Sequence, residues 1–503
     1  MKCMFRNNLM KKTLLAAGAL LLAVLFALFF LGSNSPLGPA IGSDNAIYLT
    51  MGTALKNGYA PYTQVFDHKG PLLFFLEMLA QLFTGGYSTT GVFVLETLFI
   101  WGSLVCIGAA ARRMNAASLP AQMIFLTVIA PVIDGGNYCE GYSNLLTLLG
   151  ALLLMRVFDR DELVKEAKAY FLPSLLYGAL LMISFLIRAN NMLPMAGMLL
   201  GAALLLLAKK HFAQLGVCAA GFLAGCAAAA LPVALWLLAQ GALGEAVYGA
   251  FVHNMMYAET DGGSRVGMLL HDRYGWRAMF MAALACAGGM AYAIKKRRPV
   301  VALMMIFGAA AGGFAAFISH KFYSHYLMLG APLCALGTAM LFASIRGMKR
   351  SVLCAAALVL CAACAVQLVH FGIIENNERR QAHEVYTTLE KQTQELLAHV
   401  PMEERDELLA YRTEPKWYVA ARAMPYLRFY FLQEILAQAD PAVMDEIVKT
   451  LESDPPKWLE IYYNREFGPP YDARVAEIFE TDYEFVDARG EYQLLRRKEE
   501  KHD

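Results

Sequence analysis

The chain has 503 residues, of which 58% are hydrophobic and only 17% are charged. An ordinary soluble domain has about a quarter of its residues charged, so this composition excludes a soluble globular protein. The formal net charge of +1 arises from 43 basic and 42 acidic residues, and this balance indicates no class of charged partner. The sequence has no G-x-G-x-x-G motif, P-loop or internal repeat, so we expect no nucleotide site and no nucleic-acid partner.

Apolar runs recur along the first three-quarters of the chain, and each is long enough to cross about 30 Å of hydrocarbon. We therefore predict an all-α polytopic membrane domain with about eleven transmembrane helices. The first apolar run is longer than the core of a signal peptide, about 7–15 residues, so we interpret it as an uncleaved anchor. The predicted spans are 13–32, 90–111, 118–134, 142–157, 170–187, 191–208, 212–240, 276–294, 300–318, 326–345 and 351–373.

The connectors between these spans differ in charge. Alternate connectors are rich in Lys and Arg, and the positive-inside rule assigns them to the cytoplasm together with the N-terminus. One of them, 156–169, mixes acids with bases. The sequence thus predicts a multi-pass cell-membrane protein, with a transmembrane domain of residues 1–373 and an extracytoplasmic domain of residues 374–503. The predicted outer connectors are 33–89, 135–141, 188–190, 241–275 and 319–325.

The tail from residue 374 has the composition of a small soluble domain. Residues 375–399 have a helical pattern, and 407–411 and 458–463 are typical of strands. A helix is expected over 428–438, and a hairpin over 483–495 around Arg489-Gly490. We predict a small α/β domain that serves the acceptor or gates the site. Its aromatic and Arg residues at 417–428 are expected to form mostly core and in part an acceptor surface.

The cysteines do not suggest a disulfide framework or a metal site. The chain has 10 Cys, and most of them lie within predicted spans. Cys361 and Cys364 form a C-x-x-C pair on an Ala-rich span, but there is no second pair to complete a zinc site. We interpret the cysteines as small packing residues and predict no bound metal.

The first outer loop, 33–89, gathers charge between two apolar segments and is expected to hold two juxtamembrane helices. Ile47, Met51 and Leu55 recur at helical spacing, which predicts a short amphipathic helix at the membrane interface. Ser43 and Asp44 precede this helix at the position of an N-cap.

Three residues, Asp67, His68 and Lys69, stand just before the second predicted helix of this loop, which begins at Pro71. Free N–H groups and the helix dipole attract anions to a helix start. We therefore interpret Lys69 as a phosphate-binding residue. The simpler interpretations are that Asp44 only caps its helix and that Lys69 only extends its ammonium group to the membrane surface.

Polar residues also gather in the other outer loops, whereas the spans hold few charges, with Glu96 as an exception that has no recognisable partner. Ionisable residues at a membrane edge are costly and usually functional. Acids and cations on one face of the membrane suit an anionic lipid-linked substrate and an acceptor that must lose a proton. The loop residues are Asp134, Asn137, Tyr138 and Glu140; Arg188, Asn190 and Asn191; and His320, Lys321, Tyr323, His325 and Tyr326.

Asp44, the short helix after it and the run Asp67-His68-Lys69-Gly70-Pro71-Leu72 resemble the GT-C glycosyltransferases. The similarity is closest to the branch of lipid A aminoarabinose transferases, protein O-mannosyltransferases and lipopolysaccharide galacturonosyltransferase-like proteins. That branch typically shows an acid-Lys-Pro-Pro-Leu signature. Here Gly70 replaces the first Pro, and His68 separates the acid from Lys69.

The resemblance implies a membrane glycosyltransferase that moves a sugar from a polyprenyl-phosphate donor to a cell-envelope or protein acceptor. It implies that Asp44 is the general base, that Lys69 contacts the donor phosphate, and that Glu140, or less well Asp134, is a second acid. It also implies a role for Tyr323 or Tyr326. From charge and topology we add further candidates for the departing phosphate. These are Arg188, His320, Lys321 and His325, and Asp67 and His68 are other site candidates.

The predicted chemistry is a single displacement in which one carboxylate takes the proton of the acceptor hydroxyl, so the anomeric centre inverts. Fixed cations can balance a monophosphate leaving group, so we expect neither a metal nor another cofactor. Two alternatives share the same spans. A lipid-linked sugar transporter or flippase would more often show discontinuous helices and paired charges near the bilayer midplane. A non-catalytic membrane scaffold would use the tail to bind cell-wall partners.

Overall fold

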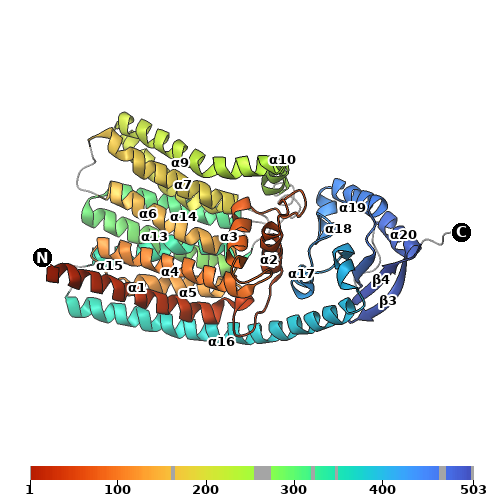
Figure 1. Cartoon of the computed structure of the whole chain (residues 1–503). Coiled ribbons are helices and arrows are strands. Elements are labelled where there is room, and N and C mark those ends of the chain that lie inside the picture. The colour runs from red at the N-terminus through yellow and green to blue at the C-terminus, as the bar shows by residue number, and fades with distance from the viewer. Residues whose placement is uncertain are drawn as a thin grey trace. The chain divides into compact units, whose positions relative to one another are not determined.

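The computed structural model describes residues 2–159, 165–253, 273–318, 323–345, 349–463 and 472–499. Within these residues, ten helices are long and apolar enough to cross a membrane, so the protein is a multi-pass membrane protein (Figure 1). The apolar helices are α1 (Lys2–Phe30), α4 (Thr89–Arg113), α5 (Leu119–Ile129), α6 (Cys139–Phe158), α7 (Phe171–Ile187), α8 (Leu193–Ala208), α9 (Phe212–Ala239), α13 (Arg273–Lys296), α14 (Pro299–Phe317), α15 (Ala331–Ser344) and α16 (Arg350–Leu397).

The predicted span 118–134 is the one that differs from the rest in length. Its helix, α5, ends at Ile129 and is followed by a single 3-10 turn, Ala130–Val132, and it counts among the shorter apolar helices. Pro131 lies in this turn, and proline has no N–H to continue the hydrogen bonds of an α-helix. Each of the ten other predicted spans coincides with a described apolar helix of spanning length.

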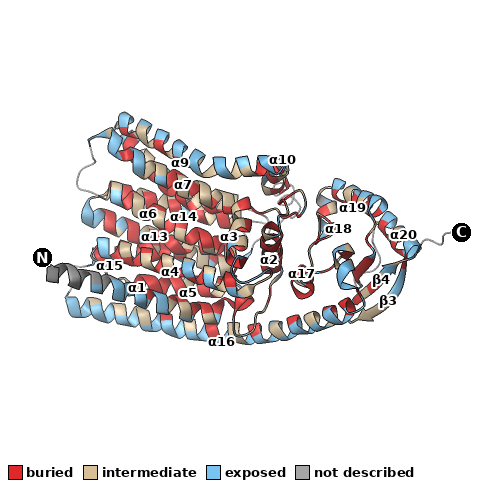
Figure 2. Cartoon of the chain, viewed as in Figure 1, coloured by how far each residue is buried: buried red, intermediate tan, exposed pale blue. Residues whose placement is uncertain are grey.

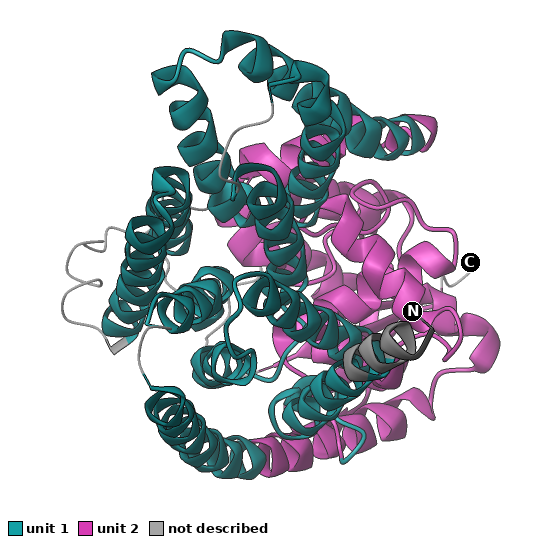
Figure 3. Ribbon diagram, turned by 90° about the vertical axis from the view of Figure 1, so that its left-hand side faces the viewer, with its two compact units in different colours: residues 1–37, 93–236, 258–378 teal, residues 38–92, 237–257, 379–503 magenta. Residues whose placement is uncertain are grey.

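The chain divides into two compact units, which Figure 3 shows in different colours. Unit 1 consists of Met1–Leu37, Phe93–Trp236 and Ala258–Glu378. Unit 2 consists of Gly38–Val92, Leu237–Tyr257 and Arg379–Asp503. Unit 2 therefore joins three segments that are far apart in the sequence: the first predicted outer loop, a short stretch after α9, and the tail.

In unit 1 the helices approach one another closely at glycines. A Cβ at Gly197 of α8 would lie 2.2 Å from the carbonyl oxygen of Phe307 in α14, and one at Gly288 of α13 would lie 2.1 Å from that of Gly337 in α15. Small residues permit such approach where van der Waals packing drives the association of membrane helices. Figure 2 shows the resulting contrast between buried inner helices and the largely exposed α9 and α16.

The mixed connector 156–169 carries an acid that joins several helix ends in unit 1. Asp159 accepts a hydrogen bond of 3.0 Å from the hydroxyl of Tyr292. Its carboxylate also lies 3.4 Å from the guanidinium of Arg298 and 4.0 Å from that of Arg113. One acid of this connector thus contacts Arg113 at the end of α4, Tyr292 of α13 and Arg298 just before α14.

The first outer loop forms α2 (Ser43–Lys56) and α3 (Pro71–Gln81) in unit 2. Pro71 occupies the first turn of α3, as predicted. The helix predicted over 45–56 is confirmed as α2, but it has no exposed polar face, because every residue from Asn45 to Leu55 is buried. The polar face of α2 packs against α3, where Thr53 donates a hydrogen bond of 2.6 Å to Gln81. The prediction of Ser43 and Asp44 at the cap is also corrected: the N-cap is Gly42, and Asp44 lies in the first turn.

The tail begins as the continuation of α16 and then forms a four-stranded sheet with strand order β1-β2-β4-β3. Strand β1 (Leu408–Tyr411) is parallel to β2 (Trp458–Tyr462), and β4 (Tyr492–Arg497) is antiparallel to both β2 and β3 (Tyr483–Arg489). The two predicted strands and the predicted hairpin are therefore confirmed. The helices are α17 (Lys416–Ala421), α18 (Gln433–Ala439), α19 (Ala442–Ser453) and α20 (Ala473–Asp482), and Leu237–Tyr257 holds α10 (Leu243–Val247) and a π-helical turn (Tyr248–His253).

The core of unit 2 contains a residue from the outer loop. Phe66 packs among the apolar residues of the tail domain, including Leu409, Phe429 and Leu459. Its backbone N–H donates a hydrogen bond of 3.0 Å to the carbonyl oxygen of Arg428. The segment that carries Asp67, His68 and Lys69 is thus anchored on the tail domain one residue earlier.

Candidate active site

Asp67, His68 and Lys69 form a chain of polar contacts in unit 2. Nζ of Lys69 lies 2.7 Å from Nε2 of His68. Because an ammonium group only donates hydrogen bonds, Nε2 accepts this one and the ring proton is on Nδ1. Nδ1 lies 3.4 Å from Oδ1 of Asp67. The chain of contacts therefore fixes both the tautomer of His68 and the position of the Lys69 ammonium group.

Lys69 is held in a buried position by the start of α3. Its side chain is 8% exposed, and its ammonium group lies 5.8 Å from the centre of the Tyr48 ring. The hydroxyl of Tyr62 donates a hydrogen bond of 2.7 Å to the Lys69 carbonyl oxygen. This placement argues against a lysine that merely extends to the membrane surface, because such a side chain would be solvated.

The two acids of this loop have different environments. Asp67 is fully buried, and its Oδ2 accepts a hydrogen bond of 3.3 Å from the backbone N–H of Lys69. Burial raises the pKa of Asp67, Lys69 lowers it, and the nearby charge of Asp44 raises it. Asp44 is half-buried in the first turn of α2, and no side chain there makes a capping hydrogen bond. Of the two acids, Asp44 is the one that is partly exposed.

In unit 1, Arg188 joins two other predicted site residues. It lies between α7 and a 3-10 turn, Ala189–Met192, as the predicted connector between two spans requires. Its Nη1 is 2.5 Å from Oε1 of Glu140, and its Nη2 donates a hydrogen bond of 2.6 Å to the hydroxyl of Tyr326. Glu140 is 1% exposed, in the first turn of α6. The three residues come from three different loops of the sequence.

Aromatic rings adjoin this Arg188 cluster. The ring of Tyr138 stacks on that of His325 with 3.9 Å between ring centres, and the ring of Tyr323 stacks on that of His325 at 5.6 Å. The hydroxyl of Tyr138 donates a hydrogen bond of 3.2 Å to exposed Asp134. The structure thus brings Asp134, Glu140, Arg188, Tyr323, His325 and Tyr326 into one neighbourhood of unit 1. His320 and Lys321 lie outside the described residues.

Glu96 is a buried acid for which the sequence indicated no partner. One carboxylate oxygen accepts a hydrogen bond of 3.2 Å from the side-chain amide of Asn34, and the other accepts one from the backbone N–H of Asn137. Asn137 in turn accepts a hydrogen bond of 2.8 Å from the hydroxyl of Tyr142. Glu96 therefore ties the loop before Glu140 to the end of α1. The signal for this role was an acid inside a span, which requires a polar partner.

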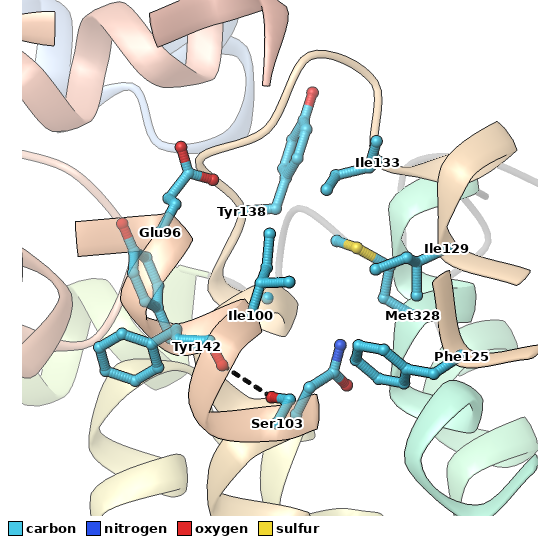
Figure 4. A pocket seen from close by; sticks show the side chains of 12 residues that line it. Glu96, Ile100, Ser103, Phe125, Ile129, Ile133, Tyr138, Tyr142 and Met328 are labelled. Carbon is cyan, nitrogen blue, oxygen red and sulfur yellow. Dashed lines mark hydrogen bonds between the residues drawn. The ribbon is translucent and has the colours of Figure 1, made fainter. Parts of the chain in front are cut away.

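Glu96 also lines a small cavity, which Figure 4 shows between Tyr142 on one side and Phe125, Ile129 and Met328 on the other. Its volume is about 20 Å³. This is enough for roughly one water molecule and too small for a sugar.

No group of three or more His, Cys, Asp or Glu side chains in the described part of the chain could hold a metal ion. The expectation of metal-independent transfer stays a prediction. The predicted shared phosphate site of Lys69 and Arg188 also stays a prediction, since these residues belong to different units.

The comparisons with known proteins find a match among solved structures only. No protein-family model matches the chain, and no curated protein matches it. ArnT from Cupriavidus metallidurans bound to undecaprenyl phosphate superposes with a TM-score of 0.63 at 12% identity, covering 95% of this chain and 98% of that chain. The same protein in the apo state superposes with a TM-score of 0.65 at 13% identity, again covering 95% of this chain and 98% of that chain.

A third solved structure extends the likeness to a more distant transferase. The oligosaccharyltransferase of Archaeoglobus fulgidus in the apo form gives a TM-score of 0.51 at 12% identity, covering 88% of this chain and 69% of that chain. ArnT, a lipid A aminoarabinose transferase, and this oligosaccharyltransferase both belong to the GT-C superfamily. The chain therefore has the GT-C fold that the first outer loop predicted.

Proposed function

We propose that this protein is an inverting membrane glycosyltransferase that moves a sugar from a polyprenyl-phosphate donor to an acceptor at the outer face of the cytoplasmic membrane. The observation that carries the proposal is the Asp67-His68-Lys69 chain, which holds a buried ammonium group at the start of α3. A helix start already favours anions, and a fixed Lys adds a point charge. The structural likeness to ArnT bound to undecaprenyl phosphate supports a lipid-phosphate ligand.

Arg188 is the second cation that we assign to the donor phosphate. Its side chain is 18% exposed, and its guanidinium lies beside Glu140 and Tyr326. A guanidinium fixed by two partners is pre-organised and can grip a phosphate at two oxygens. As the bond to the anomeric carbon breaks, negative charge grows on the leaving phosphate, and both cations stabilise it.

The environments of three acids support three different roles. Glu140 is 2.5 Å from Arg188 and is 1% exposed, so we assign it to positioning the guanidinium. Asp67 is fully buried and positions His68 and Lys69. Asp44 is half-buried and remains accessible, so we assign it the proton of the acceptor hydroxyl. One base and one displacement give inversion at the anomeric carbon.

The test uses the purified full-length protein in lipid nanodiscs with polyprenyl-phosphate sugars labelled in the sugar. Transfer predicts release of free polyprenyl phosphate and a labelled acceptor of inverted anomeric configuration, measured by chromatography and NMR. Asp44→Asn protein serves as the inactive control. The alternative, a lipid-linked sugar transporter, predicts two different results. The donor would not be turned over when a total lipid extract of the source cells is supplied as acceptor, and the intact lipid would move across proteoliposome membranes.

A further inference from the structure

Unit 2 contains a cavity of about 260 Å³ whose lining includes neither Asp44 nor Lys69. It lies between the loop segment that precedes Asp67 and the tail domain. Tyr59 and Gln64 line it from the loop, and Tyr426, Arg428, Glu446 and Thr450 line it from the tail. By contrast, Trp417 and Tyr418, two other aromatic residues of the tail that were candidates for an acceptor surface, are buried core residues.

The two walls of this cavity are held together by a fixed Arg428. Its carbonyl oxygen accepts the hydrogen bond from Phe66, and its guanidinium stacks on the rings of Phe66 at 5.6 Å and Phe429 at 4.8 Å. The guanidinium pairs with Glu446 at 3.2 Å and also with Glu245. The cavity is therefore built from both chain segments and does not depend on a mobile surface side chain.

The charges at the cavity disfavour an anionic ligand. The charged residues of the cavity lining are Arg428 and Glu446, which pair with each other at 3.2 Å, and Arg428 also pairs with Glu245 outside the lining. The cationic group of the cavity is therefore already paired, and a phosphate or a uronic acid that approached it would be repelled by Glu446. The preferred occupant is therefore uncharged.

We propose that this cavity binds an uncharged sugar ring of one of the two substrates. A sugar ring has C–H faces and a rim of hydroxyl groups. The rings of Tyr59 and Tyr426 offer apolar faces, while Gln64 and Thr450 offer polar atoms for the rim. The volume is below the range of about 300–1,000 Å³ that drug-sized ligands occupy, which fits a small ring.

This inference rests on the proposed function, because a transferase has two sources of such a ring. The ring belongs either to the sugar of the donor or to a glycan of the acceptor. Lys69 and Asp44, which we assign to the donor phosphate and to the acceptor proton, are not part of the cavity lining, so the cavity acts in substrate recognition and not in the bond-breaking step.

The binding test uses full-length protein in nanodiscs and saturation-transfer NMR with methyl glucoside, methyl galactoside and methyl mannoside, and with galacturonic acid as the charged probe. We expect magnetisation to be transferred from the protein to the ring protons of at least one neutral glycoside. The signal for galacturonic acid should be weaker. Tyr59→Ala and Tyr426→Ala should each weaken binding about tenfold or more, whereas Tyr426→Phe, which keeps the ring, should bind like the original protein.

Tyr463→Ala is the matched control, because Tyr463 is an exposed tyrosine of the same unit that does not line the cavity. Asp44→Asn protein should lose turnover and keep glycoside binding, which separates this inference from the proposed reaction. A rise in KM for the donor alone, or for the acceptor alone, in Tyr426→Ala identifies the source of the ring. The inference would be overturned if no neutral glycoside bound, or if both Tyr→Ala variants bound the glycoside as tightly as the original protein.

Discussion

The guanidinium of Arg188 bridges Glu140 and Tyr326, with Nη1 2.5 Å from the Glu140 carboxylate and Nη2 2.6 Å from the Tyr326 hydroxyl. Two partners at two nitrogens fix the plane of the guanidinium, and its centre lies 4.2 Å from the centre of the Tyr326 ring. A lysine at this position would lack the planar fork that meets the two partners at separate nitrogens, because its charge is a single point on a flexible stem.

We therefore expect Arg188→Lys to weaken binding of polyprenyl phosphate by about tenfold or more, although the positive charge is kept. The dissociation constant, measured by fluorescence titration of the purified protein, checks this. Arg113→Lys is the control, because Arg113 is an arginine of the same unit that contacts Asp159 and no residue of the Arg188 cluster. Unchanged affinity in Arg188→Lys would remove Arg188 from the donor site.

The roles assigned to Asp44 and Glu140 predict effects on different kinetic parameters, kcat for Asp44 and the donor KM for Glu140. Asp44→Asn should lower kcat by about 10²-fold or more and leave the donor KM near its original value, because only proton removal is lost. Glu140→Gln should mainly raise the donor KM, because the carboxamide still accepts a hydrogen bond but holds Arg188 less firmly. Steady-state kinetics with both substrates varied measures both parameters. The reverse pattern would make Glu140 the base.

Much of the membrane fold was predictable because apolar runs report directly on spans, and Pro71 and Arg188 mark local starts and turns. The buried position of α2 was not predictable, since Thr50 and Thr53 look like surface residues until their hydroxyls bond to carbonyl oxygens one turn earlier. The assembly of unit 2 was also missed. It depends on contacts such as that of Phe66 with Arg428, which no local pattern encodes.

The candidate site was predicted in its parts but not in its connections. Lys69 was proposed from its position before a predicted helix and Asp44 from the resemblance to the GT-C glycosyltransferases, and both assignments stay predictions. The partners of Glu96 were not, because Asn34 and Asn137 are 62 and 41 residues away in the sequence. A polar residue in a span shows that a partner exists, but only the packing of α1 and α4 shows which one it is.

Glu96→Ala should loosen the loop that leads to Glu140. The change removes a side chain that accepts two hydrogen bonds, and each such bond contributes about 0.5–1.5 kcal/mol. We expect faster hydrogen exchange over residues 133–140 and a lower melting temperature. Thr97→Val is the matched control, because the Thr97 hydroxyl bonds within α4 to Phe93. Exchange in Glu96→Ala equal to that of the control would show that Glu96 does not hold the loop.

The last prediction concerns the stability of the tail domain against pH. Glu460 is a fully buried residue of β2, and one of its carboxylate oxygens accepts a hydrogen bond of 2.5 Å from the indole of Trp417. Burial raises the pKa of Glu460 from 4.5 to about 8 in the folded state, and the Trp417 bond lowers it in part. Between pH 4.5 and 8 the folded domain thus keeps a proton that the unfolded chain releases.

The contribution of Glu460 to the stability of the tail domain should therefore be greatest below pH 4.5 and should be lost as the pH rises towards 8. The loss is at most about 5 kcal/mol. Hydrogen exchange of β1, β2 and β4 in the full-length protein from pH 5 to 8, corrected for intrinsic exchange rates, measures it. Glu460→Gln, which stays neutral, should flatten this dependence, whereas Glu484→Gln, at an exposed position of β3, should not. A pH dependence that survives in Glu460→Gln would show that another group causes it.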